Sequence, residues 1–301
     1  MIKPRVLLMV SQPFFEWRGS PIRVRYNVEA LVEAGYQVEL LTLPFGQPVE
    51  LPGVTIHRVS GLPGVHSIPI GPSFAKLLFD LKMFFKARAL LSVNTYAVIH
   101  GVEDAGFFAG LLARKRGIPF IYEKHSDPAS HQGGFLRNLL MSVYSRVESY
   151  SLKRAGHVIA TGAGLRASVR KLAPDTPCTH LFDIPSSRSE PDDGQVNQAR
   201  SRMNAAEHNV VATYVGSFAR YQGIDLLFEA IPTALRADPD LQVVIIGGTD
   251  QEIAERTLPL QQLGLTDRVQ FLGKVDPEQL PAYLRASDIL LSPRISGHNT
   301  P

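Results

Sequence analysis

Small and polar residues that suit an anionic ligand follow several short apolar runs of this sequence. Gly19 and Ser20 end the loop after the first run and stand before a helical pattern, where free backbone N–H groups bind anions. Taken alone, this loop is better read as an ordinary strand-to-helix connection. His125 follows the buried run 119–122, and an imidazole there can donate a hydrogen bond to a sugar hydroxyl or a phosphate. A lone histidine is as often structural, so both interpretations of His125 stay open.

A glycine-flanked loop in the second half of the chain is a more specific signal. A strand pattern ends at Gly216, and Ser217, Arg220 and Gln222 precede Gly223, where a helical pattern begins. Glycines let the backbone approach a ligand, and both the helix N-terminus and Arg220 favour negative charge. The alternative is a simple turn, but the combination favours phosphate binding.

Two later segments carry weaker signals. Lys274 and Val275 follow a short apolar run, where backbone groups can contact the edge of a base, although a plain turn is equally consistent with them. Arg294, Asn299 and Thr300 come shortly before a final proline that can begin a helix. Free N–H groups, a capping hydroxyl and the arginine would bind an anion there, and the alternative is an ordinary capped helix start.

Short apolar runs alternate with amphipathic segments, which predicts β–α units around parallel sheets. We expect strands at 5–10, 37–42, 54–59, 97–100, 119–122, 157–160, 178–182, 210–215, 242–246, 269–272 and 289–292. We expect helices at 26–34, 74–91, 107–115, 136–154, 225–235, 251–263 and 278–286.

The composition turns polar, with proline and glycine, just after residue 185. We therefore predict an N-terminal Rossmann-like domain at 1–185, a linker at 186–208 and a second domain at 209–301. The second domain has only the last four of the predicted strands, whereas a doubly wound mononucleotide-type domain has about six. We expect this domain to be incomplete and the chain to be truncated.

The composition excludes several classes of protein. Lys and Arg total 31 against 28 Asp and Glu, a net charge of +3 that permits an anionic substrate or membrane surface but not a nucleic-acid partner. The single cysteine, Cys178, argues against a disulfide framework and a cysteine-rich metal site. Neither a signal peptide nor an apolar run of roughly 18 residues is present, so we expect a cytoplasmic protein.

Apolar residues at helical spacing between 74 and 85, with lysines among them, raise the question of a membrane contact. Such a pattern more often forms a core face with solvated lysines, which is our interpretation. Peripheral contact with the inner face of the membrane stays as the alternative.

An ordered series of motifs resembles the retaining glycosyltransferases of the GT-B fold, family 4. Gly19-Ser20-Pro21 stands where that family has its first glycine-rich loop, and ESYSLKRAGHVI resembles the helix and strand before its domain crossover. The segments YVGSFARYQGIDLLFEA, VVIIGG, DRVQFLGKV and LPAYLRASDILLSPR follow in the family's order and spacing. The resemblance covers nearly the whole chain.

The resemblance implies an α/β protein with two Rossmann-like domains facing a cleft, the first on the acceptor side and the second binding the donor. It implies retaining transfer of a sugar from a nucleoside diphosphate sugar to a saccharide or lipid-linked acceptor in polysaccharide biosynthesis. We expect no cofactor, and the only Asp-x-Asp, at 238–240, argues against a metal because it precedes its strand, away from the expected ligand face. His125 would contact the donor sugar. The donor would bind at Gly19, Ser20, Gly216, Ser217, Arg220, Gln222, Lys274, Val275, Arg294, Asn299 and Thr300.

Two departures from the family pattern weaken this implication. Ser217 and Gln222 stand where the family commonly has an arginine and a lysine that face the diphosphate. The family's acidic pair is also missing, because Ser296 takes the first position and the second would follow residue 301. The alternatives are a non-catalytic fragment and a sugar-nucleotide epimerase of similar architecture. The absence of GxGxxG argues against a Rossmann oxidoreductase.

Overall fold

The computed structural model of the chain describes residues 3–16, 19–68, 73–126, 135–182, 187, 190–219 and 222–294, with the backbone alone for 135–141. Three predicted donor-binding residues, Arg220, Asn299 and Thr300, therefore lie outside the described residues. The chain divides into an N-terminal unit, Met1–Ile184, and a C-terminal unit, Pro185–Thr300. Each unit is built on its own parallel sheet.

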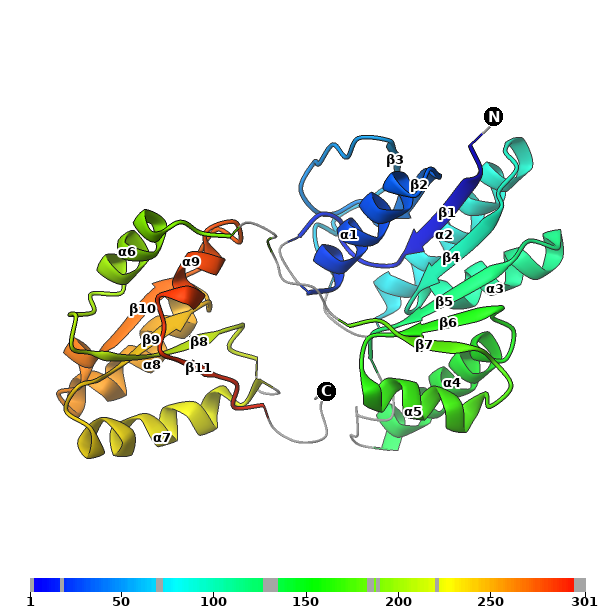
Figure 1. The fold of residues 1–301 in the computed structure, drawn as a ribbon. Helices are drawn as coiled ribbons and strands as arrows, with labels where there is room; N and C mark the ends of the chain where they lie inside the picture. Colours follow the sequence, from blue (N-terminus) through cyan, green and yellow to red (C-terminus); the bar gives the residue numbers. More distant parts are fainter. Residues whose placement is uncertain are drawn as a thin grey trace. The chain divides into compact units, whose positions relative to one another are not determined.

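The N-terminal sheet contains seven parallel strands among the described residues, in the order β3-β2-β1-β4-β5-β6-β7 (Figure 1). They are β1 (Arg5–Val10), β2 (Gln37–Thr42), β3 (Val54–Arg58), β4 (Val98–Val102), β5 (Phe120–Lys124), β6 (His157–Ala160) and β7 (Cys178–His180). All seven were predicted. However, β4 and β5 extend beyond their predicted ends, so that Glu123 and Lys124 belong to β5.

Helices cover both faces of the N-terminal sheet: α1 (Gly19–Glu33), α2 (Phe74–Val93), α3 (Ala105–Arg116), α4 (Phe135–Leu152) and α5 (Ala163–Leu172). One apolar core joins α1 to one face of the sheet through Val24 and Val28. The other face packs against α2 and α3, where Phe79 and Met83 are buried. Two sequence predictions were wrong here. Helix α1 starts at Gly19 instead of residue 26, because the proline in its first turn needs no N–H partner, and α5 was not predicted.

The C-terminal sheet has the order β10-β9-β8-β11 among the described residues, and all its pairs are parallel. Its strands are β8 (Val210–Val215), β9 (Leu241–Ile246), β10 (Val269–Gly273) and β11 (Ile289–Leu291), as predicted from the sequence to within two residues. The helices are α6 (Asp193–Arg202), α7 (Ile224–Ala237), α8 (Asp250–Gln262) and α9 (Leu280–Arg285). Figure 1 shows α7 and α8 on one side of this sheet and α6 and α9 on the other.

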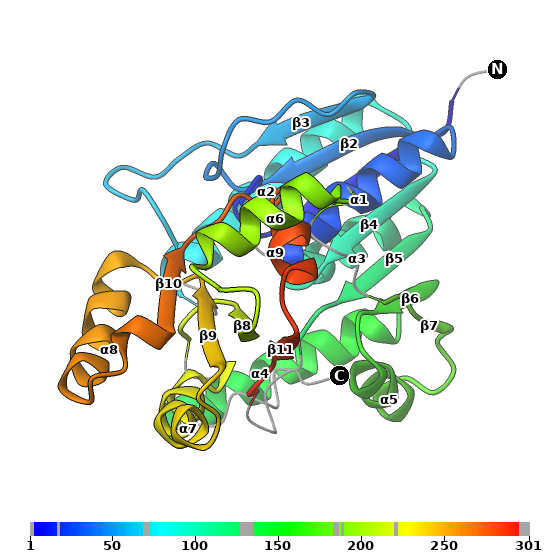
Figure 2. The ribbon, with the colours of Figure 1, turned by 60° about the vertical axis from the view of Figure 1, so that its left-hand side comes forward.

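Helix α6 lies within the range 186–208 that the sequence indicated as a linker. Asp192 caps its N-terminus in a capping box with Gln195, and the helix packs side by side with α9 (Figure 2). Ala199 and Met203 are buried in the core shared with α9. The polar composition of this range thus belongs largely to a surface helix, whose short apolar side is easily missed in a sequence.

Candidate functional site

Two residues that the sequence singled out separately meet at the carboxyl end of the N-terminal sheet. Ser20 lies in the first turn of α1, His125 follows β5, and the Ser20 hydroxyl is hydrogen-bonded to His125 Nδ1. The side-chain amide of Gln12 donates to the same hydroxyl at 3.1 Å. Gly19 is exposed, with open space around its Cα. The pair lies beside the β1–β4 switch of the strand order, where open α/β sheets bind ligands.

A carboxylate with no exposed surface, Glu123, is the centre of this site. Arg23 Nε donates to it at 2.7 Å, and Asn27 Nδ2 lies 2.9 and 3.1 Å from its two oxygens. His125 Nε2 lies 2.8 Å from Glu123 Oε1. His100 Nε2 lies 2.9 Å from Oε2, an ion-pairing distance, although its N–H is not directed at that oxygen well enough to count as a hydrogen bond. We call these five residues the Glu123 network.

The period of the secondary structure explains why these side chains converge. Successive residues of a strand point to opposite faces, so Tyr122 and Lys124 turn toward Glu148 of α4 while Glu123 turns toward α1. On α1, Arg23 and Asn27 are one turn apart and therefore share the face that covers the sheet. The guanidinium of Arg23 also donates to backbone carbonyls that follow β7, at 2.9 and 3.0 Å.

The two ionisable groups of the Ser20–His125–Glu123 chain favour each other's charged form. Burial alone would raise the pKa of Glu123, but His100 and His125, which lie 2.9 and 2.8 Å from its oxygens, favour the charged carboxylate and hold this pKa well below its usual range. Burial likewise opposes protonation of His125, yet the hydrogen bond and charge of Glu123 raise its pKa. Glu123 is therefore ionised at neutral pH, and His125 keeps its proton to a higher pH than a free histidine.

The charge of His125 determines what Ser20 can do. A doubly protonated imidazole donates from Nδ1 to the Ser20 oxygen, which also accepts from Gln12, so the Ser20 hydroxyl proton is left for another acceptor. A serine nucleophile needs the reverse, a neutral imidazole that removes the hydroxyl proton. In its doubly protonated form, which Glu123 favours, the pair is therefore a hydrogen-bond donor site for oxygen atoms and not a Ser-His-Glu nucleophile.

The stability of the N-terminal unit should depend on this ion pair at alkaline pH. Because the pKa of His125 is raised above 6.5 in the fold, the pair contributes fully below pH 6.5 and its contribution is lost as the pH rises through the folded value. The pKa of Glu123 lies far below this pH range, so Glu123 does not contribute to the change of stability with pH. We expect urea unfolding between pH 6 and 9 to show a declining free energy of unfolding, by about 1.4 kcal/mol per unit of pKa shift.

Two glutamine variants isolate this effect. His125→Gln should flatten the decline, whereas His66→Gln, at an exposed histidine, should keep the wild-type slope. Equal slopes in wild type and His125→Gln would show that the imidazole is not paired as described.

The start of the loop after β5 is fixed by a second carboxylate. Glu103, which follows β4 with a positive φ of 53°, accepts hydrogen bonds from the backbone N–H of His125 and from Ser126, whose N and Oγ lie at 2.7 and 2.6 Å. The backbone at His125 is therefore held at the same time as its ring. Among the described residues, no group of three His, Cys, Asp or Glu side chains has the arrangement of a metal site.

In the C-terminal unit, the glycines after the strands are explained by loop packing. A Cβ on Gly247 would lie 1.9 Å from the carbonyl oxygen of Gly216, and a Cβ on Gly223 would lie 1.8 Å from that of Pro293. The loop that ends at Gln222 is thus packed against the segment after β11. Each of these contacts is made within the protein, so loop packing is a second reason for glycine here, and the predicted approach of a ligand to Gly216 stays a prediction.

The other predicted donor-binding residues of this unit lie past the carboxyl ends of the strands. Ser217 is exposed, and its carbonyl oxygen accepts from the Tyr214 hydroxyl at 2.7 Å. Lys274 and Arg294 are also exposed, after β10 and β11. Val275 instead packs against the core beneath α6 and α9, so its side chain is structural.

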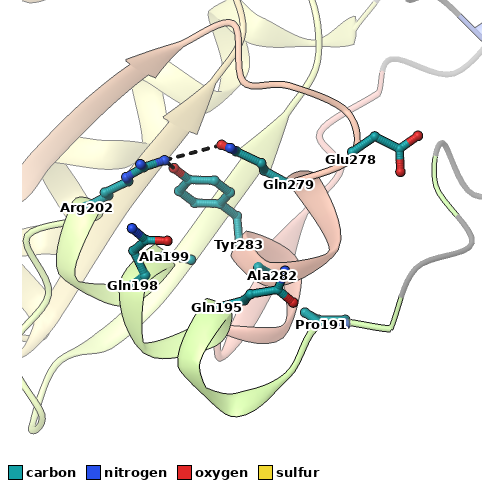
Figure 3. A pocket seen from close by; sticks show the side chains of 9 residues that line it. All are labelled: Pro191, Gln195, Gln198, Ala199, Arg202, Glu278, Gln279, Ala282 and Tyr283. Carbon is teal, nitrogen blue, oxygen red and sulfur yellow. Dashed lines mark hydrogen bonds between the residues drawn. The ribbon is translucent and has the colours of Figure 1, made fainter.

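The cavity drawn in Figure 3 is not a donor site. It lies between α6 and α9, and Arg202 donates across it to Gln279 Oε1 at 3.2 Å and to the Tyr283 hydroxyl at 3.4 Å. Its volume of about 90 Å³ is small against the roughly 300–1,000 Å³ of ligand pockets. None of the predicted site residues lines it. The lining residues are Pro191, Gln195, Gln198, Ala199, Arg202, Glu278, Gln279, Ala282 and Tyr283.

Comparison with known families places this geometry in context. Residues 18–181 match the family described as "Glycosyl transferase 4-like domain", and residues 196–299 match "Glycosyl transferases group 1". The chain belongs to the glycosyl transferase 4-like family. The first match includes all five members of the Glu123 network, so this site lies inside the domain that defines the family.

Curated relatives of this glycosyl transferase 4-like chain are glycosyltransferases. It is similar to an uncharacterized glycosyltransferase of Methanocaldococcus jannaschii (24% identical; 92% of this chain, 71% of the relative). A D-inositol 3-phosphate glycosyltransferase of Salinispora tropica is 26% identical (91% and 62%), and a phosphatidyl-myo-inositol mannosyltransferase of Mycobacterium leprae is 24% identical (93% and 70%). The chain thus spans 62% to 71% of the length of these relatives.

Solved structures share the fold. Sucrose-phosphate synthase from Thermosynechococcus elongatus has a TM-score of 0.75 at 23% identity, covering 97% of this chain and 76% of that one. Anabaena HepE in complex with UDP-glucose has a TM-score of 0.64 at 14% identity, covering 95% and 72%. The predicted fold class, α/β with two Rossmann-like units, is confirmed.

Sequence reasoning missed four members of the network in this glycosyl transferase 4-like chain: Arg23, Asn27, His100 and Glu123. The i, i+4 spacing of Arg23 and Asn27 could have indicated that the two side chains share one face of a helix. It does so only if the helix is predicted to begin at Gly19. Their partners are far away in the sequence and require the strand order.

Proposed function

We propose that this chain carries the machinery for moving a sugar from a nucleoside diphosphate sugar to a saccharide or lipid-linked acceptor, with retention at the anomeric carbon and without a cofactor or metal. The observation that carries the proposal is the hydrogen-bonded His125–Ser20 pair at the carboxyl end of the sheet, with a His125 pKa that Glu123 raises. Support comes from a structural neighbour bound to UDP-glucose and from a relative named for phosphatidyl-myo-inositol.

The charged pair suits the donor end of such a reaction. Departure of a nucleoside diphosphate leaves negative charge on oxygen, which preorganised donors stabilise more in the transition state than in the ground state. His125 and Ser20 would donate to oxygens of the donor sugar, with the N-terminus of α1 beside them. In the C-terminal unit, Lys274, Arg294 and the N-terminus of α7 would favour the diphosphate. We further assign Ser217, Arg220, Gln222, Asn299 and Thr300 to donor contacts.

Retention by a protein nucleophile is disfavoured in the N-terminal unit. Glu123 is fully buried and surrounded by donors, so its oxygens are occupied. We therefore propose that the acceptor attacks on the face from which the diphosphate leaves, with electrostatic stabilisation in place of a covalent intermediate.

Calorimetric titration of the folded 301-residue chain with UDP and GDP tests the donor proposal. Saturable binding of one of them is expected and would identify the base. A chain that binds a nucleotide but transfers no sugar from the matching donor would be a non-catalytic fragment. Where transfer occurs, NMR of the product gives the anomeric configuration, and inversion would refute the retention proposal.

His125→Ala should separate catalysis from nucleotide binding. Loss of one preorganised donor lowers the transfer rate by about 10²-fold, while the affinity for UDP, which lacks the sugar, should stay within about twofold. The rate is measured under saturating donor. His157→Ala, at a histidine of β6 whose Nε2 is hydrogen-bonded to Thr179 Oγ1 at 2.9 Å, should leave the rate unchanged. Equal rates for both variants would remove His125 from the reaction.

A further inference from the structure

A single buried guanidinium holds two distant parts of the N-terminal unit together. Arg23, which is 3% exposed, donates from Nε to Glu123 Oε1 at 2.7 Å. Its two terminal nitrogens donate to successive backbone carbonyls after β7, Nη2 to that of Leu181 at 2.9 Å and Nη1 to that of Phe182 at 3.0 Å. We call Leu181 and Phe182 the exit segment, because the chain enters the C-terminal unit shortly afterwards, at Pro185.

The carboxylate oxygen that Arg23 binds is also the one that holds the imidazole of the site. Glu123 Oε1 accepts from Arg23 Nε, and the same oxygen lies 2.8 Å from His125 Nε2. The guanidinium therefore helps to place this oxygen, and the oxygen orients the ring, whose Nδ1 is hydrogen-bonded to Ser20. Because Glu123 has no exposed surface, solvent does not weaken these contacts. A displacement of Arg23 thus reaches His125 through a single atom.

The exit segment depends on hydrogen bonds of its backbone. The ladder between β6 and β7 ends at the pair of Ala160 and His180, after which the Leu181 amide still donates to the Ala160 carbonyl at 3.0 Å. The side chains of Leu181 and Phe182 are 44% and 73% exposed, and the Phe182 ring contacts the His180 ring with centroids 4.2 Å apart. Since little of these side chains is buried, the two carbonyl contacts with Arg23 are important for holding the segment in place.

This bridge requires the planar fork of an arginine. A guanidinium presents its N–H groups in one plane, so it donates to a carboxylate from Nε and to two carbonyls from its terminal nitrogens at the same time. A lysine ammonium is a compact charge on a flexible stem, which keeps the positive charge beside Glu123 but does not reproduce the bridge. Arg23→Lys therefore separates the geometry of this contact from its charge.

We propose that Arg23 is a positioning residue for the sugar transfer, which fixes both the exit segment and the His125 ring to one guanidinium. The inference rests on the proposed function, in which His125 donates to the sugar and the C-terminal unit binds the diphosphate. The chain reaches that unit through the exit segment, so Arg23 fixes the start of this connection relative to the ring. A role confined to the stability of the fold would leave the ring and the transfer rate unchanged in a folded variant.

Arg23→Lys is the first test, with NMR and transfer kinetics as the measurements. Solvent exchange of the Leu181 amide proton and of the His125 Nδ1 proton should become about tenfold faster, because hydrogen bonds to a charged group that hold both sites are lost. The transfer rate under saturating donor should fall by about tenfold for the same reason. The affinity for UDP, which lacks the sugar, should stay within about twofold. The pKa of His125 should not change, since the positive charge is kept.

Arg23→Met removes the charge as well as the bridge. Burial opposes protonation of His125, Glu123 and Glu103 raise its pKa, and the charge of Arg23 lowers it. Loss of that charge should therefore raise the pKa of His125 and move the alkaline limb of the pH–rate profile to higher pH. Because this variant leaves the buried Glu123 carboxylate without one cation, circular dichroism first establishes that it is folded, and Arg23→Lys carries the test if it is not.

Arg25→Lys is the matched control, because Arg25 lies on the same helix, is partly exposed and pairs with Glu29 at 2.9 Å. It should match the wild type in every measurement. Wild-type exchange of the Leu181 amide and the His125 Nδ1 proton in Arg23→Lys would overturn the proposal, and so would faster exchange of both with an unchanged transfer rate. A wild-type chain that transfers no sugar would refute the proposed function instead. The two exchange rates need no donor and would still decide whether Arg23 positions His125.

Discussion

Glu123→Ala is expected to destabilise the N-terminal unit by about 3–5 kcal/mol. The substitution removes the carboxylate that lies 2.7 Å from Arg23 Nε, on a side chain that is buried, and it leaves the His125 ring without its acidic partner at Nε2. Breaking a buried ion pair from one side costs this much because the remaining charge stays out of water. Urea unfolding at pH 7, followed by circular dichroism, measures the loss.

Two further variants identify the origin of this loss. Glu29→Ala breaks the partly exposed i,i+4 pair with Arg25 on the same helix, with N and O 2.9 Å apart, and should cost about 0.5 kcal/mol. Glu123→Gln keeps the size of the side chain and an oxygen for Arg23 but removes the charge. Burial then dominates at His125, so its pKa, measured by NMR titration, should fall below 6.5. If Glu123→Ala costs no more than Glu29→Ala, the network does not stabilise the fold.

Local patterns in the sequence located the strands, but they did not identify the charged residues at the strand ends or the partners of those residues. Apolar runs of strand length predicted all the strands of both sheets. Yet Glu123 and Lys124 read as loop residues, because two charged side chains seldom continue a buried strand. They do so here because each has a partner on its own side of the sheet, Arg23 for Glu123 and Glu148 for Lys124.

Those partners could not be found from the sequence, since they depend on the order of the strands. Arg23 and Glu123 are about a hundred residues apart, and they meet only because β1 lies beside β4 and β4 beside β5. His125 was selected for its place after a strand, a rule that holds for any parallel sheet. Its charge state is a property of the neighbours that the topology brings in, and no spacing in the sequence encodes it.

In the C-terminal unit, one residue type, glycine, has two possible reasons. Glycine at 216 and 223 was interpreted as room for a ligand. In the structure a Cβ on Gly216 would meet the Tyr214 hydroxyl, and a Cβ on Gly223 would meet the carbonyl oxygen of Pro293. Ligand access and close loop packing both require glycine, so the sequence alone does not distinguish them. Only a substitution that measures stability and nucleotide binding together separates them.

Gly223→Ala is that substitution, and we expect it to lower the free energy of unfolding of the C-terminal unit by at least about 3 kcal/mol. The added Cβ would lie 1.8 Å from the carbonyl oxygen of Pro293, a backbone atom that cannot rotate away. A φ of 73° adds about 1–2 kcal/mol for a residue with a Cβ. Moving this contact also separates Gln222 from the segment leading to Arg294, so UDP binding should weaken as well.

Gly264→Ala is the matched control, because Gly264 has a similar φ of 68° and nothing within 4 Å of the added Cβ. It should cost about 1–2 kcal/mol for the backbone conformation alone and leave UDP affinity unchanged. Urea unfolding and calorimetric titration of both variants give the two quantities. If Gly223→Ala is as stable as Gly264→Ala and still loses UDP, glycine 223 serves the ligand and the sequence interpretation is restored. If stability and binding fall together, the glycine holds two loops at contact distance, and the donor site depends on that packing.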